Sequence, residues 1–380
     1  MNTEHGRLFL SPAAVEESDI EAVIRAMRSG WIAPVGPEID LLEASMADLA
    51  GRAYAVSLSS GTAALHLALK AVGIGSTHEV VVPTVTFGAT AFAVTYLGAQ
   101  AIFLDVEEQS WNLDPALLEE FLASRARTGR LPRAVVTVDL FGRTCDYSTI
   151  LPICEEYEVP VVCDSAEALG AFHGCRPAGS LGTAAVFSFN GNKIITSSGG
   201  GVLVTDDEAI AHKVRKWATQ SREPLPWYQH EEIGFNYRLS NILAALGRSQ
   251  LGRLQSVVER RRAIRDRYAL ALNGIAGATV MADPPWGRWN GWLTTVRFDS
   301  LLHLNGPTRV REALEAESIE SRPIWKPMHQ QPVFRDAEAV VTGVADRIFL
   351  EGLCLPSGTV MTVGDIDRVA DVVLETIGDA

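Results

Sequence analysis

Short apolar segments alternate with helical patterns through the first half of the chain, and this alternation constrains the fold more than any other feature. Apolar segments typical of strands lie at residues 54–58, 79–83, 101–105, 134–138 and 159–163, with helical patterns at residues 63–72, 86–96, 114–122 and 149–157. Strands that are separated by helices form βαβ units. We therefore predict an α/β fold whose mostly parallel sheet carries helices on both faces.

The C-terminal third predicts a second, smaller lobe. A long helical pattern follows Ser240 and continues through Arg267. Short strand and helix patterns come after it (residues 292–298, 308–316 and 363–377). We expect a large domain over residues 1–250 and a small α+β domain over residues 251–380, with the boundary inside the long helix.

Composition disfavours several classes of function. The formal net charge of −13 argues against a nucleic-acid surface, because phosphate neutralisation needs a basic face. Acidic residues interrupt the basic run at residues 260–267, so we assign this run to the outer face of a helix. The cysteines form no metal-ligand spacing, and we expect reduced thiols and no metal. Neither a signal peptide nor an apolar run of about 20 residues is found, so we expect a cytoplasmic protein without a membrane span.

Lys193 lies in a polar turn between two apolar strands. The first strand ends at Ser188 and Phe189, and the second covers residues 202–204. A lysine fixed between strands, with serines and glycines around it, suits a Schiff-base nucleophile close to a phosphate. Taken alone, the pattern fits an ordinary solvated loop lysine equally well, so other residues must decide between the two.

A turn of small residues, Ser59-Ser60-Gly61-Thr62, connects the first strand to a strong helical pattern. This geometry offers free N–H groups and a positive helix end to a phosphate, and Gly61 allows close approach. The turn contains neither a Walker A sequence nor GxGxxG. The alternative is a plain helix cap made by Ser60 or Thr62.

Asp164 closes an apolar strand, where a carboxylate can hold a pyridinium nitrogen protonated; the alternative is a helix N-cap. Phe87 follows another strand and can stack on a ring. Active sites of parallel sheets gather at the carboxyl ends of the strands, so we expect Gly61, Thr62, Phe87, Asp164 and Lys193 at one edge. Together they indicate pyridoxal phosphate.

The loop at residues 31–37 is too rich in Pro and Gly for a helix or an inner strand. It displays Trp31 and Ile32. These two side chains either line a substrate pocket or plug a gap between helices, and the sequence does not distinguish the two.

Four longer motifs, at residues 59–65 (SSGTAAL), 83–90 (PTVTFGAT), 164–170 (DSAEALG) and 234–241 (GFNYRLSN), carry a specific likeness. With them, the sequence resembles the DegT/DnrJ/EryC1/StrS family of sugar aminotransferases over nearly its whole length. The resemblance implies the fold-type I, aspartate aminotransferase-like architecture. It also implies pyridoxal 5′-phosphate as cofactor, with pyridoxamine 5′-phosphate as the form that carries the amino group between half-reactions.

The resemblance assigns roles to individual residues. Lys193 matches the Schiff-base lysine and Asp164 the partner of the pyridine nitrogen. Glu167 falls near the ring hydroxyl, where a Glu is the less common choice. The remaining matches are Gly61, Thr62 and Ser188 on the phosphate, Phe87 on the ring, Asn236 on the phosphate of the other subunit's cofactor, and Arg238 near the neighbour's substrate. The last two imply a homodimer with shared active sites.

Residues 189–193 (FNGNK) and 322–329 (RPIWKPMH) resemble the subgroup that aminates C4 of UDP-linked 4-keto-6-deoxy-N-acetylhexosamines, in polysaccharide biosynthesis. Asn192 then lies near the sugar, and L-glutamate is the expected donor. His329 and Lys326 either contact the sugar diphosphate or belong to a structural loop. Alternatives are a dTDP- or GDP-linked keto sugar, aminated at C3 or C4, or a non-catalytic ligand sensor. Lys193 favours transamination over the dehydratases that carry His at this position.

Overall fold

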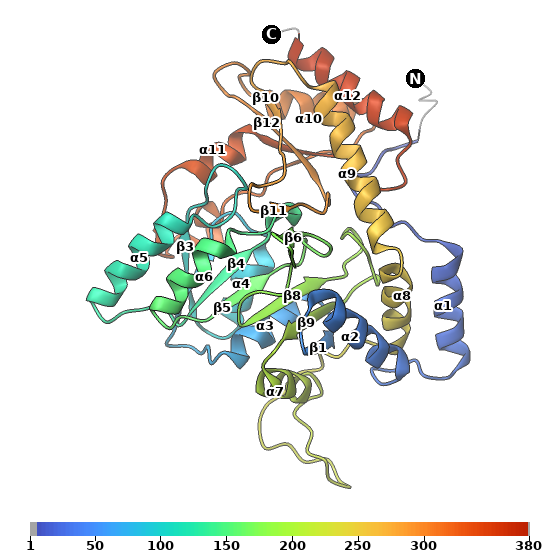
Figure 1. The fold of residues 1–380 in the computed structure, drawn as a ribbon, viewed down its shortest axis with the longest axis vertical. Coiled ribbons are helices and arrows are strands. Elements are labelled where there is room, and N and C mark those ends of the chain that lie inside the picture. Colours follow the sequence, from blue (N-terminus) through green and yellow to red (C-terminus); the bar gives the residue numbers. More distant parts are fainter. Residues whose placement is uncertain (1–5, 379–380) are drawn as a thin grey trace.

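The computed structural model describes residues 6–378, and a large mixed sheet forms its centre (Figure 1). The sheet has eight strands. In spatial order they are β1 (Tyr54–Leu58), β9 (Gly201–Thr205), β8 (Ala184–Ser188), β5 (Val161–Asp164), β4 (Ala134–Val138), β2 (Glu79–Pro83), β3 (Gln100–Leu104) and β14 (Ala339–Val340). The predicted α/β class is confirmed.

The sheet is parallel apart from one strand. Pairs between β14, β3, β2, β4, β5 and β8 are parallel, whereas β9 runs antiparallel to β1 and β8. Gly201, the first residue of β9, lies opposite both Leu58 and Ser188. The turn that follows β1 is therefore next to the end of β8, although about 130 residues of sequence separate them.

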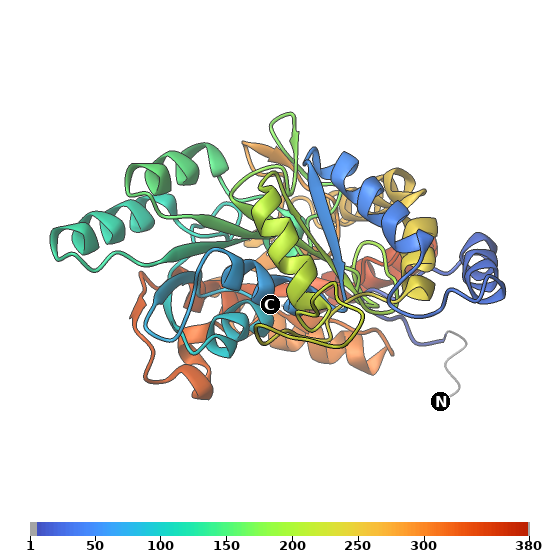
Figure 2. The same cartoon turned by 90° about the horizontal axis from the view of Figure 1, so that it is seen from below.

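Both faces of the sheet are buried under helices, as Figure 2 shows. Alternate residues of β2 belong to different cores, with Val81 on one face and Val80 and Val82 on the other. The helices of the first face are α2 (Pro37–Ala50), α5 (Pro115–Arg127) and α6 (Tyr147–Glu156); those of the second are α3 (Gly61–Ala71), α4 (Gly88–Tyr96) and α7 (Glu208–Ala218). Burial on both faces explains why the strands are continuously apolar.

The C-terminal part has its own sheet and its own core. Four strands pair in the order β10 (Ala278–Val280), β12 (Thr294–Phe298), β15 (Gly352–Leu355) and β13 (Arg322–Pro323). The core beside them lies under α9 (Leu254–Ala271), α10 (Gly306–Ala316) and α12 (Val363–Gly378). A further three-stranded sheet joins β11 (Gly287–Arg288), β6 (Phe172–His173) and β7 (Arg176–Pro177). The division at residues 250 and 251 stays a prediction.

The long helix expected through Arg267 is wrong in detail, because the chain breaks between α8 (Asn241–Leu251) and α9. Gly252 is a poor helix former. Arg253 leaves the helical conformation, and its side chain forms an ion pair of 2.7 Å with buried Asp19 of α1 (Glu17–Arg28). The amino-acid pattern is therefore helical on both sides of the break, but the contact between Arg253 and Asp19 divides the segment into two helices.

The basic run of α9 is only in part an outer face, because Arg267 is exposed while two other arginines turn inward. Arg261 is 2% exposed, and Arg265 has a largely buried side chain. Arg261 donates to the carbonyl of Trp292, and the guanidinium of Arg265 lies 5.4 Å from the ring centre of Trp289.

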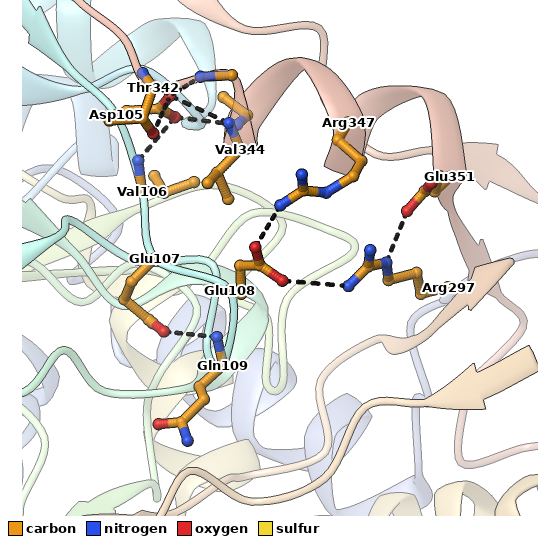
Figure 3. Close-up of polar contacts among 12 residues, drawn as sticks. Asp105, Val106, Glu107, Glu108, Gln109, Arg297, Thr342, Val344, Arg347 and Glu351 are labelled. Carbon is orange, nitrogen blue, oxygen red and sulfur yellow. Dashed lines mark hydrogen bonds and ion pairs between the residues drawn. The ribbon is translucent and has the colours of Figure 1, made fainter. Parts of the chain in front are cut away.

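A network of polar contacts fixes the C-terminal part on the large sheet (Figure 3). The buried carboxylate of Asp105, just after β3, accepts N–H bonds from Thr342 to Ala345 at the start of α11 (Val344–Glu351). Glu108 pairs with Arg347 of α11 and with Arg297 of β12. Figure 1 also shows a loop, residues 221–235, that projects beyond α7. No helix within residues 6–378 is long and apolar enough to cross a membrane.

Candidate active site

A cavity of about 860 Å³ opens at the carboxyl ends of the parallel strands. It brings together eight of the residues selected from the sequence: Gly61, Thr62, Phe87, Asp164, Glu167, Ser188, Asn192 and Lys193. The N-terminal segment around Phe9 and the segment around Arg322 complete the wall. The edge of the sheet thus collects the predicted site, as expected for this topology.

The turn before α3 is built to receive an anion. Ser60, not Thr62, caps the helix, because its Oγ accepts from the N–H of Ala63 at 3.0 Å. The N–H groups of Gly61 and Thr62 have no acceptor among the described residues and lie in the first turn of the helix. A Cβ atom on Gly201 would come within 2.6 Å of the Gly61 nitrogen, so only glycine leaves this end open.

Asp164 is buried at the end of β5. Thr90 of α4 donates to its Oδ2 at 2.6 Å, and the N–H of Ala166 donates to Oδ1 at 3.2 Å. No helix begins after Asp164, so the bond from Ala166 closes a local turn and Asp164 is not a helix N-cap. Burial raises the pKa of Asp164, while the Thr90 hydroxyl opposes that effect. A positive charge on a bound ring nitrogen would favour the ionised carboxylate further.

Lys193 is not a solvated lysine. Its side chain is 11% exposed, and Nζ lies 3.0 Å from Glu167 Oε1 and 4.2 Å from the ring centre of Trp292. Glu167 is itself buried, and its Oε2 accepts from the N–H of Phe141 at 2.7 Å. Burial raises the pKa of Glu167 to about 7, against the opposing effects of Lys193 and the Phe141 N–H. The carboxyl group of Glu167 can therefore gain or lose a proton near neutral pH.

Pyridoxal phosphate fits this donor set. The open helix end suits its phosphate, Asp164 suits the ring nitrogen, and Lys193 suits the aldehyde carbon. Phe87 is half exposed on the cavity wall, with its ring 5.7 Å from that of Trp325. The fold and this cavity define a pyridoxal-phosphate-dependent aminotransferase.

Comparison with known proteins gives the family. A model of the DegT/DnrJ/EryC1/StrS aminotransferase family matches residues 13–374. EpsN of Bacillus subtilis (strain 168), itself assigned to the pyridoxal phosphate-dependent aminotransferases, is 42% identical over 97% of this chain and 96% of its own. The GDP-perosamine synthase of Caulobacter vibrioides is 35% identical over 96% of each chain. The crystal structure of DesI in the presence of its TDP-sugar product superposes with a TM-score of 0.90 at 31% identity, covering 99% of this chain and 95% of DesI.

The chain therefore belongs to the DegT/DnrJ/EryC1/StrS aminotransferase family, and it is a pyridoxal-phosphate-dependent sugar aminotransferase. The family and the cofactor expected from the motifs are confirmed.

Several residues selected from the sequence lie outside the cavity. Trp31 and Ile32 are exposed, so within one chain they neither line the pocket nor plug a gap between helices. Asn236 is exposed and pairs with the backbone of Thr219. Arg238 turns inward and forms an ion pair of 2.7 Å with Glu43 of α2. Within one chain, none of these four residues lines the cavity.

His329 does not face the cavity, contrary to a role on the sugar diphosphate within this chain. Its Nδ1 lies 2.7 Å from Thr84 Oγ1, and its Nε2 lies 2.9 Å from Asp346. Both ring nitrogens are thus occupied. Lys326 is exposed and also outside the lining. For His329 and Lys326, these positions favour the structural alternative, whereas Arg322 of the same segment lines the cavity.

Three residues that line or support the site were missed in the sequence. Thr90 lies within the quoted motif 83–90, and a hydroxyl one helical turn after Phe87 could have been tested as a partner of Asp164. Trp292 is one of three tryptophans at intervals of three residues, with Trp286 and Trp289. This spacing is conspicuous in the sequence, but it does not indicate which residue each tryptophan contacts. Arg322 belongs to a motif that was noted for the sugar, but had no role of its own.

Proposed function

We propose that this enzyme transfers the amino group of L-glutamate to the C4 keto group of a nucleotide-linked 4-keto-6-deoxy sugar. The substrate that the motifs favour is a UDP-2-acetamido-2,6-dideoxy-4-keto-hexose. The observation that carries the proposal is the buried Lys193–Glu167 pair beside Asp164 in a cavity large enough for both a cofactor and a sugar. The product belongs to polysaccharide biosynthesis.

The chemistry divides between cofactor and protein. Bound pyridoxal phosphate supplies an electron sink that stabilises negative charge at the substrate carbon. The N–H groups of Gly61 and Thr62, with the Ser188 hydroxyl, hold the phosphate. Asp164, oriented by Thr90, keeps the ring nitrogen protonated. The ring of Phe87 limits movement of the bound ring and excludes water from one side.

Lys193 and Glu167 manage the proton. In the first half-reaction, Lys193 Nζ takes the proton from the glutamate carbon that bears the amino group, and 2-oxoglutarate leaves. In the second, the same nitrogen returns a proton to C4 of the sugar. Glu167, at 3.0 Å, stabilises the protonated amine between these events. The site is shielded enough to keep this proton from bulk water, since the Lys193 side chain is 11% exposed.

Among the described residues, Arg322 is the cationic side chain besides Lys193 that lines the cavity, and it supports a diphosphate substrate. Arg322 is 67% exposed in its side chain and is held by Glu320 at 2.8 Å. A guanidinium at a cavity wall can bind phosphate oxygens in a bidentate manner. Asn192 lies on the same wall and offers an amide to sugar hydroxyls.

We also propose a homodimer with shared active sites. The projecting loop carries exposed Trp227, Tyr228 and Ile233, and Trp31 and Ile32 are exposed on another surface. Exposed apolar side chains of this size suit a protein interface. Asn236 and Arg238, which follow the loop, would then reach the partner's cofactor and substrate.

The test is a substrate panel. The purified protein is loaded with pyridoxal phosphate and incubated with glutamate and UDP-, dTDP- or GDP-linked 4-keto sugars. Mass spectrometry and NMR then identify the product and the aminated carbon. A preference for a GDP- or dTDP-linked sugar as acceptor would overturn the UDP assignment. Both are included in the panel because one relative is named a GDP-perosamine synthase and the DesI structure was determined with a TDP-sugar product. A protein that cannot take up the cofactor would instead be a ligand sensor.

A further inference from the structure

We propose that the segment Trp289-Asn290-Gly291-Trp292 is the positioning element of the active site. It fixes Lys193 and Glu167 relative to each other, and α9 in turn fixes the segment. These residues are positioning residues and not catalytic ones, because they act through Lys193 and Glu167. The inference concerns aminotransferase chemistry at Lys193 and does not depend on which sugar nucleotide is accepted.

Trp292 fixes Lys193. Its ring lies 4.2 Å from Nζ, which suits a cation–π contact with a protonated amine. Its indole N–H donates to the carbonyl of Asn192, the residue before the lysine, at 2.7 Å. Ser11 Oγ donates to the same carbonyl at 2.8 Å. Both the head group and the backbone of the lysine are therefore held by this one side chain, with help from Ser11.

Asn290 fixes the backbone of Glu167. The side-chain amide of Asn290 donates to the carbonyl of Glu167 at 2.6 Å and to that of Leu169 at 3.0 Å. Its Oδ1 accepts from the N–H of Trp292 at 3.0 Å. The same side chain thus connects the two ends of the ion pair.

Trp289 fixes the carboxylate of Glu167 through Phe141. Its indole N–H donates to the Phe141 carbonyl at 2.6 Å, while the Phe141 N–H donates to Glu167 Oε2 at 2.7 Å. Phe141 adopts φ 52°, a left-handed conformation that is strained for an aromatic residue. Gly142 follows, where a Cβ would lie 1.9 Å from Asn290 Oδ1. The strained peptide is kept in place by the segment, and it points its N–H at Glu167.

The segment is itself held by arginines of α9 and by Arg143. Arg261 donates to the Trp292 carbonyl at 2.6 Å, and Arg262 donates to the Trp289 carbonyl at 2.5 Å. The guanidinium groups of Arg143 and Arg265 lie 4.4 and 5.4 Å from the ring centre of Trp289. These four arginines thus help to position the site.

The experiment compares three identical substitutions. Trp289→Phe, Trp292→Phe and Trp286→Phe each remove one indole N–H bond to a carbonyl, of 2.6, 2.7 and 2.9 Å. Trp286 donates to Thr144, which has no bond to Lys193 or Glu167, so it is the matched control. In the glutamate half-reaction, followed by rapid mixing, we expect Trp289→Phe and Trp292→Phe to lower the limiting rate on the order of 100-fold with little change in KM. Trp286→Phe stays within about twofold of the unsubstituted enzyme.

A second readout uses the apoprotein. Its lysines are Lys70, Lys193, Lys213, Lys216 and Lys326. Methylation of the lysine amines with a ¹³C label therefore gives few NMR signals. The signal that disappears in Lys193→Arg is assigned to Lys193. Its shift follows the ionisation of Glu167, whose charged and titratable neighbours are Lys193, Asp164 and Cys354. Loss of the Phe141 anchor in Trp289→Phe removes support for the carboxylate, so the pKa of Glu167, about 7, moves higher. In Trp286→Phe, the pH at which the Lys193 signal shows the ionisation of Glu167 stays unchanged.

The proposal would be overturned if all three substitutions changed the limiting rate of the half-reaction and the pKa of Glu167 equally. A general loss of packing would then explain the changes. Unchanged rates in Trp289→Phe and Trp292→Phe would also overturn the proposal. If either variant does not fold, Ser11→Ala tests the same carbonyl of Asn192 from the N-terminal segment. We expect a several-fold lower limiting rate there, and an unchanged rate would count against the proposal.

Discussion

The buried carboxylate of Asp105 is one of the contacts that attach the C-terminal part to the large sheet, and Asp105→Asn tests its contribution directly. Asp105 Oδ2 accepts from the N–H groups of Thr342, Gly343 and Val344 at 2.6, 2.8 and 3.2 Å, and Oδ1 accepts from Val106 and Ala345 at 2.8 and 2.9 Å (Figure 3). An asparagine keeps one acceptor and turns the other into an NH₂ group that faces donors.

The magnitude follows from these contacts. A hydrogen bond to a charged group contributes about 1.5–3 kcal/mol, and a buried donor left unsatisfied costs about 1–3 kcal/mol. The substitution removes the charge and leaves N–H groups at the start of α11 without an acceptor. Since such terms are not additive, we expect a loss of about 3–5 kcal/mol in the free energy of unfolding.

Urea denaturation at pH 7, followed by circular dichroism, measures this loss. Asp114→Asn is the matched control, because Asp114 caps α5 on the surface through the N–H groups of Ala116 and Leu117. A loss of about 1 kcal/mol or less is expected there. If Asp105→Asn costs no more than Asp114→Asn, the view that this carboxylate fastens the two parts is wrong.

The difference in unfolding free energy between Asp105→Asn and the unsubstituted protein should depend on pH in a defined direction. Burial acts to raise the pKa of Asp105, but the N–H bonds from Val106, Thr342 and Ala345 outweigh it and hold the pKa below its ordinary value of 3.8. The stabilisation is therefore present above pH 3.8 and is lost as the pH falls through the lower pKa of the folded state. The free-energy difference between Asp105→Asn and the unsubstituted protein should be constant from pH 7 to 5 and shrink in stronger acid.

Three further substitutions test the site. Glu167→Gln should stabilise the apoprotein more at pH 8 than at pH 5 in thermal melts, because a pKa raised from 4.5 to about 7 means that the buried carboxylate loses stability as the pH rises; an equal change at both values contradicts this. Arg322→Gln should raise KM for the sugar nucleotide about tenfold and leave the glutamate half-reaction unchanged, whereas a slowed half-reaction would place Arg322 on the donor. Asp164→Asn should lower the limiting rate of both half-reactions on the order of 100-fold, and retention of either rate refutes its role at the ring nitrogen.

The sequence predicts the parts of this site that follow from sheet topology. Asp164 ends a strand, and Gly61 and Lys193 follow strands. Parallel strands bring their carboxyl ends to one edge, so the proximity of these residues needs no side-chain information. Lys193 and Glu167 could be assigned through the motifs, but not their 3.0 Å contact.

Other features depend on tertiary contacts that periodicity does not record. A charged residue in a helical pattern suggests a solvated face, yet Arg261 is buried against the carbonyl of Trp292. The break at Gly252 depends on the pairing of Arg253 with Asp19, more than 200 residues away. The inward turn of Arg238 likewise depends on Glu43. Each of these contacts joins segments distant in sequence, so no local pattern identifies them.

The central claim, that Lys193 at this edge of the sheet transfers an amino group to a sugar nucleotide, is tested most directly by isotope transfer. The enzyme loaded with pyridoxal phosphate is incubated with ¹⁵N-labelled L-glutamate and the UDP-linked 4-keto sugar, and the product is analysed by mass spectrometry. The account predicts ¹⁵N at C4 of the sugar with the native enzyme and none with Lys193→Arg. Unlabelled sugar with the native enzyme, or equal labelling with Lys193→Arg, would contradict it.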